Sequence, residues 1–167
     1  MATGRKIVVA VDDSPISCEA VEWASKKLLS PNDEVHIISV LDPGARPDIT
    51  AAGESSYVLD ETECKPNPLL LERRAKMLKE YQSTVAANSG TKNVKLTTLV
   101  SCVGGSTDLG RHICEYAAEN KADMLVMGSR GMGSVKRFGA AIFGLGSVSD
   151  FVTRHAQNVL VHRSSQN

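Results

Sequence analysis

The chain has 167 residues, of which 42% are hydrophobic and 23% charged, and these values are typical of one globular domain with its own core over residues 1–167. Its 19 Lys and Arg residues balance its 19 Asp and Glu residues, and a zero net charge argues against a general nucleic-acid binder, which carries a basic excess. No apolar run approaches the roughly 20 residues that a membrane-spanning helix needs, so we expect no membrane partner.

The first predicted element is a strand over Lys6–Val11, because a continuous run of β-branched residues is typical of a strand covered on both faces. The acidic turn Asp12–Pro15 ends this strand. An amphipathic helix follows, for which either Ser14 or Ser17 is a candidate N-cap. Glu34–Leu41 is again apolar and predicts the second strand.

Residues 43–67 show no clear periodicity and predict a long loop, of a length that is usually functional or mobile. A lid, a partner surface and a mobile surface insertion all fit this pattern. Pro68 suits the first position of a helix, and the apolar spacing over Leu69–Ala87 continues that helix. Val94–Val100 predicts a third strand, which is less apolar and therefore nearer an edge of the sheet.

The last third of the chain predicts four shorter elements. These are a helix over Leu109–Glu119, a buried strand over Met124–Met127, a short helix over Val148–His155 and a last strand over Asn158–His162. The alternation of strands and helices predicts an α/β fold: a doubly wound five-stranded parallel sheet, in the order 3-2-1-4-5, with helices on both faces. In that order the first strand lies beside the fourth, and ligands bind outside the carboxyl ends of such a pair.

The stretch after the fourth strand combines flexible backbone with positive charge. It contains Gly128, Arg130, Gly131, Gly133 and Gly146, and it leads into the predicted helix start at Ser147. Glycine lets backbone N–H groups approach phosphate oxygens, and a helix start adds unpaired donors. The acidic turn after the first strand suits ribose hydroxyls or an adenine edge instead. The sequence therefore predicts a phosphate site here, although it matches neither a Walker A loop nor the dinucleotide fingerprint.

Gly128-Ser129-Arg130-Gly131, followed by Gly146-Ser147, resembles the nucleotide motif of the universal stress proteins, Gly-x2-Gly-x9-Gly-[Ser/Thr]. Further similarity lies in residues 7–14, 40–42, 122–131 and 146–156, so the resemblance covers nearly the whole chain in order. It implies an ATP- or AMP-binding stress-response protein that acts as a dimeric, nucleotide-dependent regulator of unidentified protein partners. Members of this family generally dimerise, often through the last strand, which here is Asn158–His162.

The resemblance also implies the residues of the nucleotide site. In ATP-binding members, the end of the first strand holds adenine and ribose, and a backbone group after the second strand contacts adenine. The phosphates lie on the glycine loop and on the helix start that follows it. The corresponding residues of this chain are Ala10, Val11, Asp12, Val40, Gly128, Arg130, Gly131, Gly133, Gly146, Ser147, Val148 and Ser149.

The chain departs from the family motif in the length of its glycine stretch. Residues 132–145 separate Gly131 from Gly146, and these are fourteen residues where the motif has x9. The additional residues can bulge outward and leave Gly146 and Ser147 on the phosphates, or they can fill the site. The second outcome gives the alternative function, a dimeric interaction protein of the same fold that binds no nucleotide.

No pattern in the chain supports strong catalysis, because it has no nucleophile elbow and no histidine-rich metal cluster. We therefore expect at most slow ATP hydrolysis. Asp12 and Asp13 are candidate ligands for a Mg²⁺ ion on the phosphates, since that ion prefers carboxylate oxygens. The four cysteines form no Cys-x-x-Cys pair, which argues against zinc and a disulfide framework and favours a reducing, cytoplasmic setting.

Overall fold

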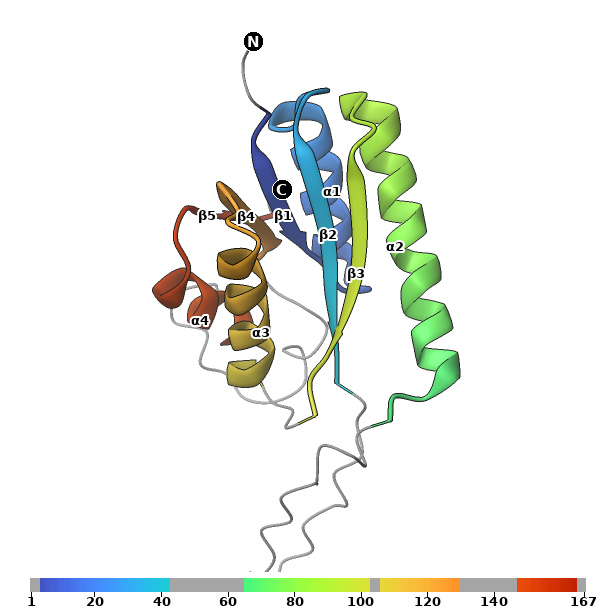
Figure 1. Cartoon of the computed structure of the whole chain (residues 1–167), viewed down its shortest axis with the longest axis vertical. Coiled ribbons are helices and arrows are strands. Elements are labelled where there is room, and N and C mark those ends of the chain that lie inside the picture. Colours follow the sequence, from blue (N-terminus) through green and yellow to red (C-terminus); the bar gives the residue numbers. More distant parts are fainter. Residues whose placement is uncertain (1–3, 43–64, 103–105, 130–146, 165–167) are drawn as a thin grey trace, which may run out of the picture.

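The computed structural model describes residues 4–42, 65–102, 106–129 and 147–164. Within these residues, five strands form one parallel sheet in the order β3-β2-β1-β4-β5 (Figure 1). The strands are β1 (Lys6–Ala10), β2 (Glu34–Leu41), β3 (Val94–Val100), β4 (Met124–Gly128) and β5 (Val159–His162). The predicted doubly wound sheet is confirmed.

Helices cover both faces of the sheet. They are α1 (Pro15–Lys27), α2 (Pro68–Ser89), α3 (Ser106–Glu119) and α4 (Ser147–His155). α1 and α2 lie on one face, and α3 and α4 lie on the other (Figure 1). In β1, Ile7 and Val9 join a core cluster with α1 and α2, whereas Val8 and Ala10 join a second cluster with α3 and α4. Side chains alternate along a strand, so a strand buried on both faces is apolar throughout.

The helix ends lie where side chains satisfy their backbone groups. Ser14, rather than Ser17, is the N-cap of α1, and its side chain accepts a hydrogen bond from the Ser17 backbone N–H. Asn67 caps α2, and Gly90 ends α2 with a left-handed backbone (φ 71°) that favours glycine. α3 begins before the predicted position, at Ser106. Asp108 lies in its first turn, where a negative charge stabilises the helix.

The amino ends of the strands are fixed by Asp33, a side chain that is only 2% exposed. Its carboxylate accepts hydrogen bonds from the Arg5 backbone N–H (3.1 Å), the Arg5 guanidinium (2.7 Å) and the Ser30 backbone N–H (2.8 Å). Burial acts to raise the pKa of Asp33, but the hydrogen bonds from Arg5 and Ser30 outweigh burial, and the pKa lies below its ordinary value. Asp33 therefore joins the turn before β2 to the residue before β1.

Cys102, which follows β3, is disulfide-bonded, while Cys18 and Cys114 are free. The absence of a Cys-x-x-Cys pair does not exclude such a bond, because disulfides join residues distant in sequence and their pairing cannot be read from spacing. Cysteine usage therefore gives no support to a reducing compartment. Among the described residues, no helix has both the length and the apolar character needed to cross a membrane.

Candidate functional site

The carboxyl ends of β1 and β4 lie side by side at the centre of the sheet, as the sequence predicts. Ala10 is paired with Met127, so the turn after β1 and the residues after β4 leave the sheet at the same edge. The chain continues from β1 into α1 on one face, and the next described element after β4 is α4 on the other face. Sheets of this kind usually bind their ligands in the crevice between two connections that part in this way.

Asp12 uses one carboxylate oxygen to order its own turn. Its Oδ1 accepts hydrogen bonds from Ser14 N (3.0 Å), from Ser14 Oγ and from Ser17 Oγ (2.7 Å). The Asp12 backbone N–H in turn donates to Ser17 Oγ at 3.1 Å. Its Oδ2 makes no hydrogen bond within the described part of the chain. Asp12 therefore supports the start of α1 and still has a second acceptor oxygen for a ligand.

The implied adenine residues Ala10, Val11 and Val40 lie at the ends of β1 and β2. Val11 is buried and its backbone is already paired, because its N–H donates to Ile38 O (2.8 Å) and its carbonyl accepts from Ser39 Oγ (2.7 Å). Ala10 and the half-buried Val40 pack on the face covered by α3 and α4, whereas Val11 packs on the other. The structure thus brings Ala10 and Val40 to one face of the sheet and separates Val11 from them.

Gly128 ends β4 against the first turn of α1. A Cβ atom at this position would lie 3.1 Å from both Cγ1 and Cγ2 of Ile16 and 3.3 Å from its backbone carbonyl carbon. These distances are shorter than ordinary van der Waals contact, so the glycine permits the close approach of α1 to β4. Packing at the crevice therefore explains Gly128, beside the phosphate role that the resemblance implies.

A side-chain hydrogen bond ties the start of α4 to the end of β4. Ser149 is 2% exposed, and its hydroxyl donates to the carbonyl of Ser129 (2.8 Å), whose N–H donates to His162 O of β5 (2.8 Å). Ser147 is exposed and Val148 is half-buried in the same turn of α4. The first N–H groups of a helix have no intrahelical partners and form the positive end of its dipole, so α4 brings anion-binding donors to this edge.

Four of the implied binding residues, Arg130, Gly131, Gly133 and Gly146, lie outside the described residues. The segment 132–145 and most of the predicted 43–67 loop also lie outside them. Within the ranges that are described, no group of three or more His, Cys, Asp or Glu side chains is arranged to hold a metal ion. The two carboxylates that the sequence suggests for Mg²⁺, those of Asp12 and Asp13, lie in the turn after β1.

Two residues of α2 reach this turn, and sequence reasoning did not assign either to the site. The Tyr81 hydroxyl donates to the backbone carbonyl of Asp12 (3.0 Å), and Arg74 Nη1 lies 3.9 Å from Asp13 Oδ1. Burial, followed by the nearby Cys18 and the two aspartates, raises the pKa of Tyr81 to about 12. In the sequence, the signal for this contact is a tyrosine on the apolar face of a helix, because a buried tyrosine hydroxyl usually has a hydrogen-bond partner.

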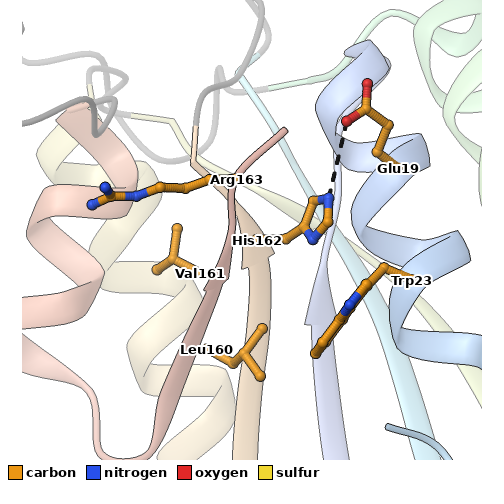
Figure 2. A pocket seen from close by; sticks show the side chains of 6 residues that line it. All are labelled: Glu19, Trp23, Leu160, Val161, His162 and Arg163. Atoms are coloured by element: carbon orange, nitrogen blue, oxygen red, sulfur yellow. Dashed lines mark ion pairs between the residues drawn. The ribbon is translucent and has the colours of Figure 1, made fainter. Parts of the chain in front are cut away.

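A groove of about 510 Å³ runs along the edge strand β5 (Figure 2). It is lined by Glu19, Trp23, Leu160, Val161, His162 and Arg163. The His162 Nε2 atom lies 3.9 Å from Glu19 Oε2, and the His162 ring centroid lies 5.7 Å from that of Trp23. Figure 2 shows the Arg163 side chain pointing away from this group. The groove thus contains most of the strand that the resemblance implies for dimerisation.

Comparison with known families gives one match over nearly the whole chain. The model of the "Universal stress protein family" matches residues 4–163. The curated universal stress protein Rv1996 of Mycobacterium tuberculosis is 28% identical over 155 residues, which are 92% of this chain and 46% of that protein. The chain therefore spans about half the length of the curated relatives that it matches.

Solved structures show the same fold. A universal stress protein in complex with cAMP superposes with a TM-score of 0.64 at 22% identity, over 98% of this chain and 100% of that one. The universal stress protein from Archaeoglobus fulgidus in complex with dAMP gives a TM-score of 0.60 at 19% identity, over 95% of this chain and 98% of that one.

Proposed function

Because the chain belongs to the universal stress protein family, we propose that it is a cytoplasmic, dimeric regulator of a stress response that binds ATP or AMP in the crevice between β1 and β4. The observation that supports this most is the hydrogen bond from Ser149 to Ser129. It holds the start of α4 at the end of β4, although the glycine stretch is longer than the family motif. The first turn of α4, with its backbone donors, thus lies at the carboxyl edge of β4.

The two sides of the crevice have complementary chemistry for a nucleotide. Oδ2 of Asp12 and the carboxylate of Asp13 are acceptors for ribose hydroxyls or for the adenine amino group. The first turn of α4 suits the phosphates, and Arg130 is the candidate cation that the sequence offers for them. A bound Mg²⁺ would offset phosphate charge beside the acidic turn. The solved family members with cAMP and dAMP support adenine nucleotides as the ligand class.

We also propose β5 as the strand through which two copies associate. The backbone carbonyls of Asn158 and His162 accept hydrogen bonds from Leu125 and Ser129, at either end of β4. The backbone groups of Val159 and Val161 therefore point away from the sheet, since alternate residues of a parallel strand bond to the same neighbour. Unpaired groups on an edge strand are a template for another strand, and a second β5 would pair with them.

Isothermal titration calorimetry with ATP and AMP tests the nucleotide site. We expect micromolar dissociation constants for the wild type. Ser149→Ala releases α4 from Ser129 and should weaken binding about fivefold, the effect of one hydrogen bond of about 1 kcal/mol. Thr153→Ala is the matched control, because it removes an exposed hydroxyl that bonds only within α4, to Asp150 O.

The alternative function makes the opposite prediction for the same protein. If neither nucleotide gives heat, and mass spectrometry of the denatured protein shows no retained nucleotide, the proposed binding is wrong. The chain would then act as a dimeric interaction protein that binds no nucleotide.

A further inference from the structure

Within the proposed nucleotide site, on which this inference rests, we propose that Tyr81 and Arg74 of α2 are positioning residues that hold the Asp12–Asp13 turn in the geometry that binds an adenine nucleotide. Neither residue belongs to the implied binding set. Tyr81 and Arg74 contact the turn and hold its geometry, and the turn in this proposal contacts the nucleotide. α2 is therefore part of the machinery that sets nucleotide affinity.

Tyr81 connects α2 directly to the end of β1. Its side chain is 8% exposed, and its hydroxyl donates to the Asp12 carbonyl at 3.0 Å. Because burial and the nearby acidic groups raise the pKa of Tyr81 to about 12, the hydroxyl keeps its proton and remains a donor at neutral pH. Asp12 is thus held at its carboxylate by the serines of α1 and at its carbonyl by α2.

Arg74 lies about two helical turns before Tyr81, on the same face of α2. Its Nη1 atom is 3.9 Å from Asp13 Oδ1, and the Arg74 side chain is 18% exposed whereas that of Asp13 is 49% exposed. The partly buried guanidinium therefore attracts a more exposed carboxylate toward α2. The same cation offsets part of the negative charge that two adjacent aspartates present to a nucleotide.

The contacts from α2 differ in kind from the other hydrogen bonds of the turn. Ser14 and Ser17 belong to the turn itself and to the helix that follows, so they move with Asp12. α2 is a separate element that packs over β2 and β3 and against α1. A turn that is fixed from a separate element is preorganised, and preorganisation lowers the entropy lost on binding. By linkage, a nucleotide that prefers the held turn must also favour the contact with α2.

Tyr81→Phe tests the inference because it removes only the hydroxyl. We expect AMP binding to weaken about fivefold by calorimetry, as for one neutral hydrogen bond. Tyr116→Phe is the matched control. Tyr116 is equally buried, but its hydroxyl lies within hydrogen-bonding distance of His36 and Thr97 on the opposite face of the sheet. The control should change AMP affinity by less than about twofold.

Amide hydrogen exchange supplies a readout that general destabilisation would not give. In the nucleotide-free protein, Tyr81→Phe should speed exchange at the amides of Ser14 and Ser17, while Tyr116→Phe should not. A double-mutant cycle of Arg74→Gln with Asp13→Asn tests the second contact. The AMP affinity lost in the double variant should be smaller than the sum of the losses in the two single variants, and Arg74→Lys should restore part of the loss caused by Arg74→Gln.

The outcomes separate this inference from the proposed function. Equal AMP affinity in Tyr81→Phe and Tyr116→Phe, with normal binding by the wild type, overturns the positioning role and leaves the nucleotide site. Weaker binding in Tyr81→Phe with unchanged exchange at Ser14 and Ser17 also overturns it, because the hydroxyl would then act on the ligand itself. No AMP binding by the wild type overturns both proposals.

Discussion

The two carboxylate oxygens of Asp12 have different roles: one stabilises the fold, and the other remains available to a ligand. Ser14 and Ser17 donate hydrogen bonds to Oδ1, while Oδ2 has no partner among the described residues. Removing the whole side chain would therefore disturb the start of α1 as well as any ligand. Asp12→Asn is the more informative substitution, because it keeps an acceptor oxygen for the serines and removes the charge that a ligand would meet.

Asp33 is expected to make stability depend on pH. Its pKa is lowered in the folded protein, so its contribution is fully present above the unfolded pKa of about 3.9 and is lost as the pH falls through the lower folded value. Asp33→Asn should reduce the free energy of unfolding by about 2–4 kcal/mol at pH 7, because the donors of Arg5 and Ser30 lose the charged acceptor that the buried Asp33 supplies. Urea denaturation at pH 7 and at pH 3 should show this difference shrinking in acid.

Glu22→Gln is the control for Asp33→Asn. Glu22 is an exposed carboxylate, and the hydrogen bond from Lys26, one turn further along α1, lowers its pKa. Solvent screens such a surface pair, so the substitution should leave the unfolding curve unchanged. A difference between Asp33→Asn and wild type that persists undiminished at pH 3 would contradict the assigned role of the Asp33 charge.

Helices α3 and α4 meet at a glycine. A Cβ atom on Gly110 would lie 2.6 Å from Cδ1 and 3.0 Å from Cγ of Phe151. The Phe151 ring is itself stacked on His155, with ring centroids 4.0 Å apart, so a second neighbour limits its movement. Gly110→Ala should lower the free energy of unfolding by about 1–3 kcal/mol through overpacking, even though alanine favours a helix by about 1 kcal/mol.

Chemical denaturation of Gly110→Ala measures this effect, and Phe151→Leu provides the partner for a double-mutant cycle. The smaller, more flexible leucine should relieve the clash, so the double variant should be more stable than the sum of the two single effects predicts. Additive effects would show that the helices separate freely. In that case α4 would not be held at a fixed distance from α3.

Strand and helix patterns predict the elements well because burial decides them locally. β2 and β3 coincide with the predicted Glu34–Leu41 and Val94–Val100, since both are rich in β-branched residues and bounded by turn residues. The start of α3 is earlier than the apolar spacing predicts. A polar first turn contributes no apolar periodicity, and only its capping chemistry marks it.

The sequence predicts those parts of the site that follow from the order of the strands, and it does not predict contacts between side chains that are distant in the chain. The strand order alone places Asp12 beside the end of β4, because the switch point follows from alternating elements and right-handed crossovers. The contact between Tyr81 and Asp12 joins residues 69 positions apart. Apolar spacing identifies the buried face of α2, but it does not show which polar atom on that face reaches which acceptor. The disulfide of Cys102 escapes prediction for the same reason.

The proposed nucleotide site and the proposed dimer strand lie on adjoining edges of the sheet. The proposed nucleotide site lies at the carboxyl edge of the sheet, and the proposed dimer strand β5 forms a lateral edge (Figure 1). They meet at Ser129, whose N–H donates to His162 O of β5 and whose carbonyl accepts from Ser149 of α4. A change in the position of α4 on nucleotide binding would therefore reach β5 through Ser129, in addition to the apolar contacts between α4 and β5.

Association through β5 can be tested with a single backbone donor. The carbonyls of Asn158 and His162 face β4, so the N–H of Val161 points outward, and Val161→Pro removes it without removing a bond inside the sheet. Thr98→Pro is the matched control on β3, the opposite edge, because Ser101 N and Asn93 O bond to β2 and leave the N–H of Thr98 pointing outward. Light scattering after size-exclusion chromatography should give a dimer for the wild type and for Thr98→Pro, and a monomer for Val161→Pro. A dimer that survives in Val161→Pro while circular dichroism shows an intact fold would place the interface elsewhere, and the link through Ser129 would then have no role in assembly.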